Sequence, residues 1–318
     1  MTASRRPLPE HPALLPGARC VRRQADQRQV DAGPGRAAVL PEHPEVLALL
    51  AGLAGRAPLR RPTAGSLADR CLHLLHERRL LVDAEEYAAA RRSVGAATAD
   101  AVFARDPDRA AARLRARADA TVGVQTSSPE SASLVHGLLR AAGVTTSSAA
   151  DPAATVALLI SADEPDRPAA ARLVTAGTSH LLVRPTTDGA LVGPFVEPGR
   201  TACLGCWDAH LTDRDPKHPV VTHQLASLPG PPADPLAWQS ALAHAVADVV
   251  RHVDGVDGVD GERPRSWSSL LAVGADGSLA RQQVRRHPAC ACCAEAHHHS
   301  ESSLPSIARR LSREQVSQ

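Results

Sequence analysis

The sequence predicts an α/β protein with an N-terminal winged-helix-like α+β domain, followed by a Rossmann-like domain that carries a structural zinc knuckle. Three observations lead to this prediction. Short strand patterns followed by two amphipathic helices fill the first 90 residues. Strand and helix patterns then alternate from residue 120 onward, as they do in three-layer α/β domains. Finally, two C-x-x-C pairs occur far apart in the chain, at Cys203/Cys206 and Cys290/Cys293.

Residues 1–90 form the first predicted domain. Strands are expected at 17–23, 28–32 and 36–40, and Gly33-Pro34-Gly35 is typical of the turn between the last two. Pro44 opens a helix with apolar residues at helical spacing, and Ser66 caps a second helix with an apolar face. Three strands followed by helices favour a winged-helix-like module, although an α+β domain of no particular family would give the same pattern.

Residues 91–117 are rich in alanine and arginine and predict a helical connector. The second domain is expected over 118–295. Its strand patterns at 121–124, 155–160 and 180–183 alternate with helix patterns, and the run at 155–160 is apolar throughout. A strand that is apolar on both faces is typical of a parallel sheet covered by helices. The order β-α-β-α-β therefore predicts a Rossmann-like sheet.

The end of the second domain brings the last cysteines into place. Asp234 caps a predicted long helix that runs to His252. A hairpin is expected from 266–273 and 278–285, turning at Asp276-Gly277. This hairpin would deliver Cys290 to the first cysteine pair. The polar segment 296–318 is predicted to be a flexible tail.

Two C-x-x-C pairs supply the four thiolates of a tetrahedral Zn²⁺ site. The predicted ligands are Cys203, Cys206, Cys290 and Cys293. Cys292 leaves a C-x-C pair with Cys290 open as an alternative. Two further alternatives are a redox-active cysteine pair and a catalytic zinc that recruits a histidine, from among His287, His297, His298 and His299. Cys20 and Cys71 are interpreted as ordinary small residues.

The composition excludes several functional classes. Hydrophobic residues make up 43% of the chain, enough for a folded aliphatic core. A net charge of +2 gives no strong attraction to nucleic acid or to a membrane. The sequence has no apolar run long enough for a transmembrane helix and no secretory signal. Paired cysteines without a signal peptide predict a cytoplasmic protein.

The stretch from Gly193 to Asp208 reads G-P-F-V-E-P-G-R-T-A-C-L-G-C-W-D and is followed by T-D-R-D-P. Together with the His287-Pro288 to Cys293 segment, it resembles the ThiF-like (ubiquitin-activating-type) proteins of bacteriocin-type peptide natural-product clusters. The resemblance covers residues 120–293 most strongly. It implies a cyclodehydratase partner that binds the leader peptide of a ribosomally made precursor. It also implies a YcaO-type enzyme as the second partner, which turns Cys, Ser or Thr into azolines. Whether the chain forms a homodimer is left open.

Members of this group that adenylate a substrate carry a glycine-rich loop after the first strand of the domain, where backbone N–H groups receive ATP phosphates. The corresponding stretch here runs from Gly123 to Glu130 and lacks those glycines. Pro129 removes an N–H donor, and Glu130 brings a negative charge to the phosphate position. We therefore expect no ATP and no catalysis by this chain alone. The alternatives are an active adenylating enzyme, a zinc-stabilised interaction scaffold and a thiol oxidoreductase.

The expected peptide site lies on the first domain, whose third strand would be an exposed sheet edge to which an extended peptide can add. The helix beginning after Ser66 would form the adjacent wall, and arginines would pair with acidic leader residues. The YcaO-type enzyme is expected to dock on residues 118–293. The predicted peptide-binding residues are Arg36, Ala37, Ala38, Val39, Leu40, Leu67, Arg70, Cys71, Leu74 and Arg78.

Overall fold

The computed structural model describes residues 7–255 and 263–292. Cys293, the histidines at 297–299 and the predicted tail 296–318 lie outside these residues. The chain divides into two compact units. Unit 1 comprises Met1–Ala118 with Ala141–Gly143, and unit 2 comprises Asp119–Arg140 with Val144–Gln318.

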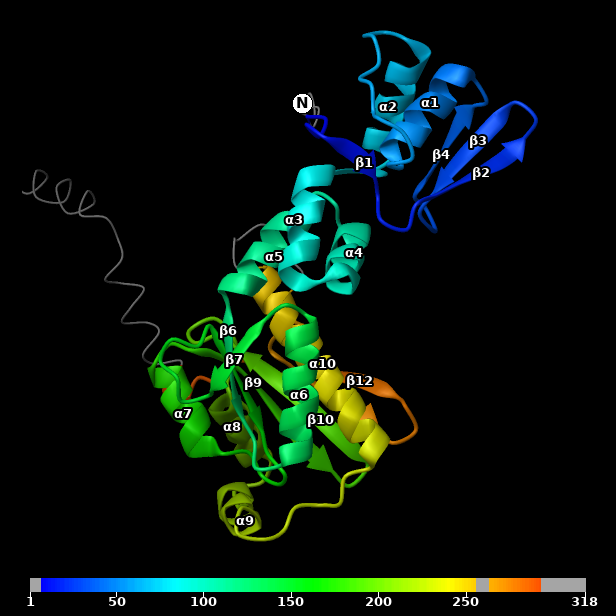
Figure 1. The fold of residues 1–318 in the computed structure, drawn as a ribbon. Coiled ribbons are helices and arrows are strands. Elements are labelled where there is room, and N and C mark those ends of the chain that lie inside the picture. Colours follow the sequence, from blue (N-terminus) through cyan, green and yellow to red (C-terminus); the bar gives the residue numbers. More distant parts are fainter. Residues whose placement is uncertain (1–6, 256–262, 293–318) are drawn as a thin grey trace, which may run out of the picture. The chain divides into compact units, whose positions relative to one another are not determined.

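Unit 1 begins with the predicted strands and helices (Figure 1). Strands β2 (Arg19–Gln24), β3 (Gln27–Asp31) and β4 (Ala37–Pro41) form an antiparallel sheet in the order β2-β3-β4. Helices α1 (Pro44–Leu53) and α2 (Leu67–Glu77) follow, and the Ser66 hydroxyl caps α2 by accepting from the Asp69 N–H, as predicted. Their apolar faces pack on the alternate strand residues Val30, Ala38 and Leu40.

Unit 1 also contains a two-stranded sheet that the sequence patterns did not predict. Strand β1 (Pro12–Leu14) pairs antiparallel with β5 (Leu81–Asp83). Three residues that begin with proline are too short to show an alternation. The alanine-rich stretch after β5 forms three helices, which pack around Val82, Phe103 and Leu114. These helices are α3 (Ala84–Val94), α4 (Ala96–Arg105) and α5 (Ala110–Asp119).

Unit 2 is built on one seven-stranded sheet in the order β12-β11-β10-β9-β8-β6-β7. Strands β6, β7, β8 and β9 are parallel, as the β-α-β pattern predicts. The remaining pairs are antiparallel, so the sheet is mixed. Its strands are β6 (Thr121–Gln125), β7 (Thr145–Ser148), β8 (Val156–Ile160), β9 (Ser179–Thr186), β10 (Gly189–Val196), β11 (Ser269–Gly274) and β12 (Leu279–Gln283).

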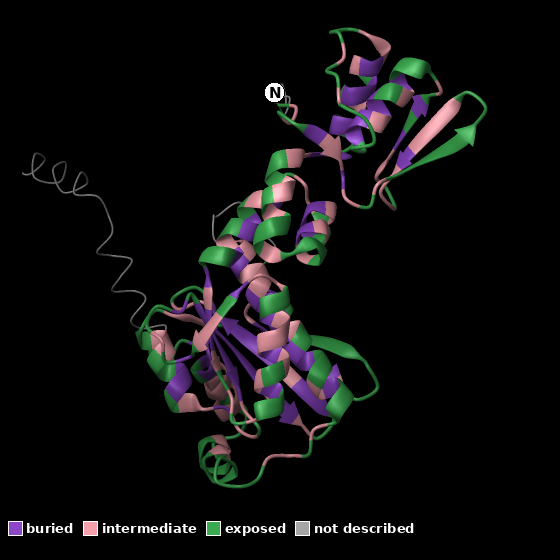
Figure 2. Ribbon diagram, in the orientation of Figure 1, coloured by how far each residue is buried: buried purple, intermediate pink, exposed green. Residues whose placement is uncertain are grey.

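Helices cover both faces of this sheet. In Figure 1, α6 (Pro129–Ala141) and α10 (Pro235–Asp254) lie in front of the strands. Helices α7 (Arg167–Thr175) and α8 (Leu204–Arg214) pack on strands β8 and β9 through an apolar cluster that contains Ala157, Ala170 and Leu204. Strands β8, β9 and β10 in the middle of this sheet are largely buried, whereas β2 of unit 1 is exposed along its length (Figure 2).

A buried carboxylate fixes the chain after α10. Asp248 is 1% exposed and accepts from the backbone N–H of Arg265 at 2.8 Å. It also accepts from the Ser266 N–H at 2.8 Å and the Ser266 hydroxyl at 2.6 Å. These bonds compensate the cost of burying the charge, and they place the start of β11 beside β10. None of the helices in the described parts of the chain is long and apolar enough to cross a membrane.

Candidate functional site

The first cysteine pair lies at the start of helix α8 (Leu204–Arg214). Cys203 is the N-cap of α8, and Cys206 lies in its first turn. Residues three apart on a helix share a face, so the C-x-x-C spacing points both sulfurs the same way. A side chain larger than hydrogen would crowd the cluster at Gly205, because a Cβ there would lie 3.2 Å from the Cys290 sulfur.

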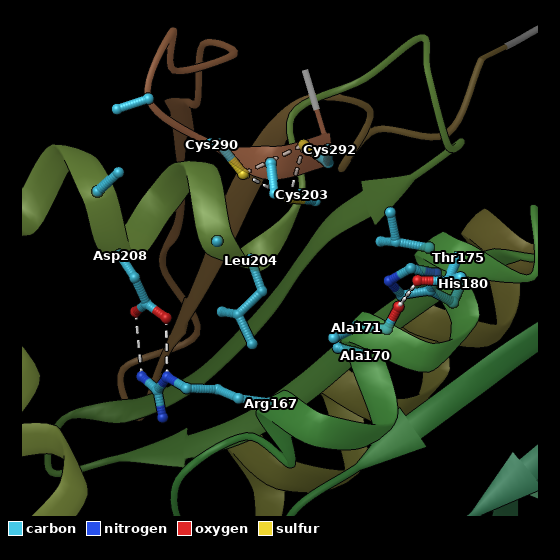
Figure 3. A pocket seen from close by; sticks show the side chains of 15 residues that line it. Arg167, Ala170, Ala171, Thr175, His180, Cys203, Leu204, Asp208, Cys290 and Cys292 are labelled. Atoms are coloured by element: carbon cyan, nitrogen blue, oxygen red, sulfur yellow. Dashed lines mark hydrogen bonds and ion pairs between the residues drawn. The ribbon is translucent and has the colours of Figure 1, made fainter. Parts of the chain in front are cut away.

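The second segment meets this turn after β12, and it does so with Cys290 and Cys292. The Cys203 sulfur lies 3.6 Å from that of Cys290 and 3.1 Å from that of Cys292. The Cys206 and Cys292 sulfurs are 3.5 Å apart. Figure 3 shows Cys203, Cys290 and Cys292 together. The structure therefore gathers the C-x-C alternative, with Cys292 as the fourth sulfur. Cys293, the predicted fourth ligand, is outside the described residues.

The four sulfurs fit a tetrahedral metal ion. Zinc–sulfur bonds of about 2.3 Å place neighbouring sulfurs of a tetrahedron about 3.8 Å apart. Five of the six sulfur–sulfur distances run from 3.1 Å, for Cys203 to Cys292, to 3.9 Å, for Cys203 to Cys206, and all four sulfurs lie within 4.8 Å of one another. Two of the four cysteines are buried and two are half-buried. The cluster is compatible with a zinc site of the closed, all-thiolate type.

The thiols affect one another's protonation. Hydrogen bonding with the Cys206 thiol, together with burial, raises the pKa of Cys203 to about 12. The same contact with Cys203 lowers the pKa of Cys206. Hydrogen bonds to Cys203 and Cys206 raise the pKa of Cys292. The raised pKa values keep the thiols of Cys203 and Cys292 protonated in the absence of a metal ion, whereas a coordinating dication deprotonates thiols outright.

His287, the alternative zinc ligand, is engaged elsewhere. Its Nε2 lies 2.9 Å from an Asp213 carboxylate oxygen, and its Nδ1 accepts from the Ala289 N–H at 3.2 Å. The Nδ1 bond leaves the proton on Nε2, which donates it to Asp213. His210 packs edge-on against the His287 ring, with ring centroids 4.7 Å apart. The contacts of His287 with Asp213 and His210 connect the end of α8 to the segment before Cys290. Sequence spacing alone could not predict them.

In the loop that would receive nucleotide phosphates, side chains of the loop itself make the hydrogen bonds. Ser128 precedes α6, and its hydroxyl oxygen accepts from the Ser131 N–H at 3.1 Å. The same hydroxyl donates to the Glu130 carboxylate at 2.9 Å. The Glu130 backbone N–H and the Ser128 hydroxyl hold the pKa of the Glu130 carboxyl below its usual value. Gly123 serves close packing instead, because a Cβ there would lie 2.7 Å from the Ala149 Cα.

Strand β4 of unit 1 pairs with β3 alone among the described strands, so its other edge is open. Backbone bonds link Ala32 to Arg36 at one end of the ladder and Glu42 to Asp26 at the other. Hydrogen-bonded and non-bonded pairs alternate in an antiparallel ladder. Ala38 and Leu40 therefore bond to β3, while Ala37, Val39 and Pro41 turn their backbone groups to the open edge.

The side chains predicted to bind a peptide divide into three environments. Ala38, Leu40 and Cys71 are buried in the core of unit 1. Leu67 and Leu74 on α2 are half-buried, and Val39 is 40% exposed.

The three arginines of this set differ as well. The Arg36 guanidinium donates to the carbonyls of Ala104 and Arg105 at the end of α4, so both of its terminal nitrogens already donate within unit 1. Arg70 donates to the Gly65 carbonyl at 2.6 Å. Arg78 is exposed.

Comparison with known proteins places this fold among two kinds of solved structure. No family model matches the sequence, and no curated protein matches it. A heterocyclase in complex with substrate and cofactor is similar over 89% of this chain and 39% of its own, with a TM-score of 0.61 at 19% identity. The heterocyclase TruD is similar over 89% and 42%, with a TM-score of 0.60 at 17% identity.

The second kind is MccB of E. coli. Its complex with AMPCPP and MccA is similar over 89% of this chain and 99% of its own, with a TM-score of 0.58 at 14% identity. MccB has also been solved with ATP. The present chain thus spans about two fifths of the heterocyclases it resembles and the whole length of MccB. At these identities the likeness establishes the fold.

Proposed function

We propose that this chain is a non-catalytic partner protein of bacteriocin-type peptide biosynthesis. It binds the leader peptide of a ribosomally made precursor and presents it to a YcaO-type cyclodehydratase for azoline or azole formation. The observation that carries the proposal is the open β4 edge, in a fold shared with heterocyclases and with MccB. A heterocyclase solved with its substrate and MccB solved with MccA support a substrate-binding role.

The first part of unit 1 is the proposed peptide-recognition module, of winged-helix-like type. An extended leader adds to β4 as a further antiparallel or parallel strand. Ala37 and Val39 offer outward N–H groups and carbonyls, whereas the Pro41 carbonyl already accepts from the His43 N–H at 3.0 Å. Each such bond contributes about 0.5–1.5 kcal/mol net. The half-buried Leu67 and Leu74 of α2 are the nearest apolar side chains for leader residues in this module.

The sulfur cluster is the proposed site of one structural zinc ion. Cys203, Cys206, Cys290 and Cys292 would hold it, and with all four positions filled by thiolates it has no open position for catalysis. Its role is to fasten the segment after β12 to the start of α8. The redox alternative requires an accessible low-pKa thiol, whereas Cys206, the thiol whose pKa is lowered, is fully buried.

ATP-dependent adenylation is the competing function, and the MccB complexes with ATP and AMPCPP favour it. The Ser128 and Glu130 contacts argue against it here, because a carboxylate already occupies the end of α6 where phosphates would bind. A zinc-stabilised scaffold that binds no peptide is the third candidate, and peptide affinity separates it from our proposal.

The test is a fluorescence-polarisation titration of the full chain with the fluorescein-labelled leader of the precursor encoded in the same gene cluster. Saturable binding in the micromolar range or tighter is expected, and a scrambled leader of equal composition should bind at least tenfold more weakly. A parallel assay follows azoline formation by the YcaO-type enzyme, which should require this chain. Absence of leader binding would favour the scaffold.

A further inference from the structure

Unit 2 contains a cavity of about 440 Å³ between helices α7 and α8 (Figure 3). The two helices face each other with small side chains, among them Ala170 and Ala171 on α7 and Gly205 and Ala209 on α8. Val174 on α7 and Leu204 on α8 complete the two mostly apolar walls, and we call the space between them the slot. Its volume lies in the range of small-molecule sites. This slot belongs to unit 2 and is separate from the β4 edge of unit 1.

A histidine lines the slot from the sheet side. His180 lies on β9, between Ala157 of β8 and Val196 of β10, and is 0% exposed. Its Nδ1 lies 3.0 Å from the carbonyl oxygen of Thr178. A carbonyl only accepts, so Nδ1 carries the proton and Nε2 presents a lone pair. That Nε2 atom is buried and has no hydrogen-bond partner within the described parts of the chain.

The slot borders the sulfur cluster, because Cys203, Cys290 and Cys292 line it as well. The remaining polar side chains of the slot already have hydrogen-bond partners. Arg167 forms a paired contact with the Asp208 carboxylate, at 2.8 Å from Nε and 3.1 Å from Nη2. Its Nη1 donates to Glu164 at 3.1 Å. The Thr175 hydroxyl donates to the Ala171 carbonyl at 3.2 Å. The carboxylates of Asp208 and Glu164 neutralise the Arg167 guanidinium. The slot therefore has no free positive charge that would attract an anionic ligand.

A buried acceptor without a partner costs about 1–3 kcal/mol, and a ligand can remove that cost by bringing a donor. We propose that this slot binds a flat, uncharged aromatic group that carries one N–H or O–H donor, and that the donor bonds to His180 Nε2. The mostly apolar walls accommodate the ring, and the lone pair selects the donor. Such a group occurs in a free heteroaromatic molecule and in the side chain of a tryptophan.

The probe is indole, and benzofuran is its control, because benzofuran has the same shape and lacks the N–H. Titrations of the full chain are followed by NMR on protein labelled with ¹⁵N-histidine. Indole should bind about tenfold more tightly than benzofuran. The His180 Nε2 resonance should shift with indole and stay in place with benzofuran, a readout that needs no substitution.

Two variants localise the effect. Ala171→Trp fills the slot from an exposed rim position and should abolish indole binding. His180→Leu should remove the preference for indole over benzofuran. His136→Leu on α6, away from the lining residues, is the matched control and should retain both binding and preference.

A second probe, N-acetyltryptophanamide, distinguishes the two sources of the aromatic group. Binding of indole alone assigns the slot to a free heteroaromatic, and binding of the amide at equal or higher affinity assigns it to a side chain of a partner. The proposal is overturned if neither probe binds at millimolar concentration. Equal affinities for indole and benzofuran would also overturn it, as would indole binding unchanged by Ala171→Trp.

Discussion

The sulfur of Cys203 lies 3.1 Å from the sulfur of Cys292, although 89 residues separate them in the chain. The first caps helix α8, and the second follows the β11–β12 hairpin. Between them the chain forms α8, α9 (His218–Leu225), α10 and both hairpin strands. A metal ion at this point would therefore join the two ends of a large part of unit 2.

The first prediction concerns zinc and stability. The purified chain should contain about one Zn²⁺, and Cys206→Ser should lose it and unfold at much lower temperature. Structural zinc contributes on the order of 10–16 kcal/mol of apparent binding free energy, since folding and binding are coupled. Metal analysis and thermal unfolding measure the two effects. Cys20→Ser, at an exposed strand position, is the control and should keep both zinc and stability. Metal-free wild-type protein would contradict the prediction.

The second prediction identifies the fourth ligand. Cys292→Ser should lose zinc, because the Cys292 sulfur lies 3.1 Å from Cys203, 3.5 Å from Cys206 and 3.2 Å from Cys290. Cys293→Ser should retain it. Zinc content of the two matched variants is the measurement. The reverse result would assign the site to the C-x-x-C pair of Cys290 and Cys293.

The third prediction tests strand addition at β4. Val39→Pro should weaken leader binding by about tenfold or less, since it removes one outward N–H and leaves the ladder with β3 intact. Pro41 already occupies the equivalent outward position, so the strand accommodates proline there.

Ala38→Pro is the matched comparison, because Ala38 bonds inward to β3 and its substitution should destabilise unit 1 itself. Circular dichroism separates the two effects. Unchanged leader affinity in a folded Val39→Pro variant would place the peptide elsewhere.

The fourth prediction is that the chain neither binds nor turns over ATP. Glu130 and Ser128 occupy the N-terminal end of α6 with a carboxylate and a hydroxyl. Pyrophosphate exchange and ATP-dependent thermal stabilisation should both be absent. Affinity for ATP in the micromolar range would restore the adenylating function. Glu130→Gly should not create such affinity, because Pro129 still lacks an N–H.

The fifth prediction concerns pH. Burial lowers the pKa of His180 to about 4 from an ordinary value of 6.5, and the bond from Nδ1 to Thr178 opposes this only in part. The unfolded chain then binds more protons than the folded one between these two values. Stability is therefore fully present above pH 6.5 and falls as the pH drops toward 4, by about 3 kcal/mol.

Urea unfolding at pH 7 and pH 5 measures this loss. The same measurement on His180→Leu isolates it from the acid release of any metal, which affects both proteins. The variant should lose less stability on acidification than the wild type. Equal losses in the two proteins would contradict the prediction.

Much of the fold follows from local patterns in the sequence. A strand buried on both faces requires apolar residues throughout, which identifies β8. A helix start favours a residue such as serine that can cap it, and Ser66 identifies the start of α2 in this way. Asp234 likewise accepts from the N–H groups of Leu236 and Ala237 at the start of α10. In contrast, the sequence patterns indicated no helix at Leu204–Arg214, where Gly205 lies beside the Cys290 sulfur.

The sites were less predictable than the fold. The zinc-compatible cluster follows from cysteine spacing, yet the choice between Cys292 and Cys293 depends on the path of the chain after β12. The unpartnered Nε2 atom of His180 could not be predicted from the sequence. The residue lies in an apolar strand, and the ring nitrogen that carries the proton is determined by the contact with the Thr178 carbonyl. The open side of β4 required the pairing register, which only the structure supplies.

Pro41 also bears on the solubility of the protein before any peptide arrives. An uncovered strand edge tends to recruit an identical edge from another copy, and such pairing starts aggregation. In β4 only Ala37 and Val39 present N–H groups outward, and Pro41 contributes none. Two copies that meet edge to edge would form a short ladder with carbonyls left unmatched. A longer guest strand, with all its own amides available, has the advantage over self-association.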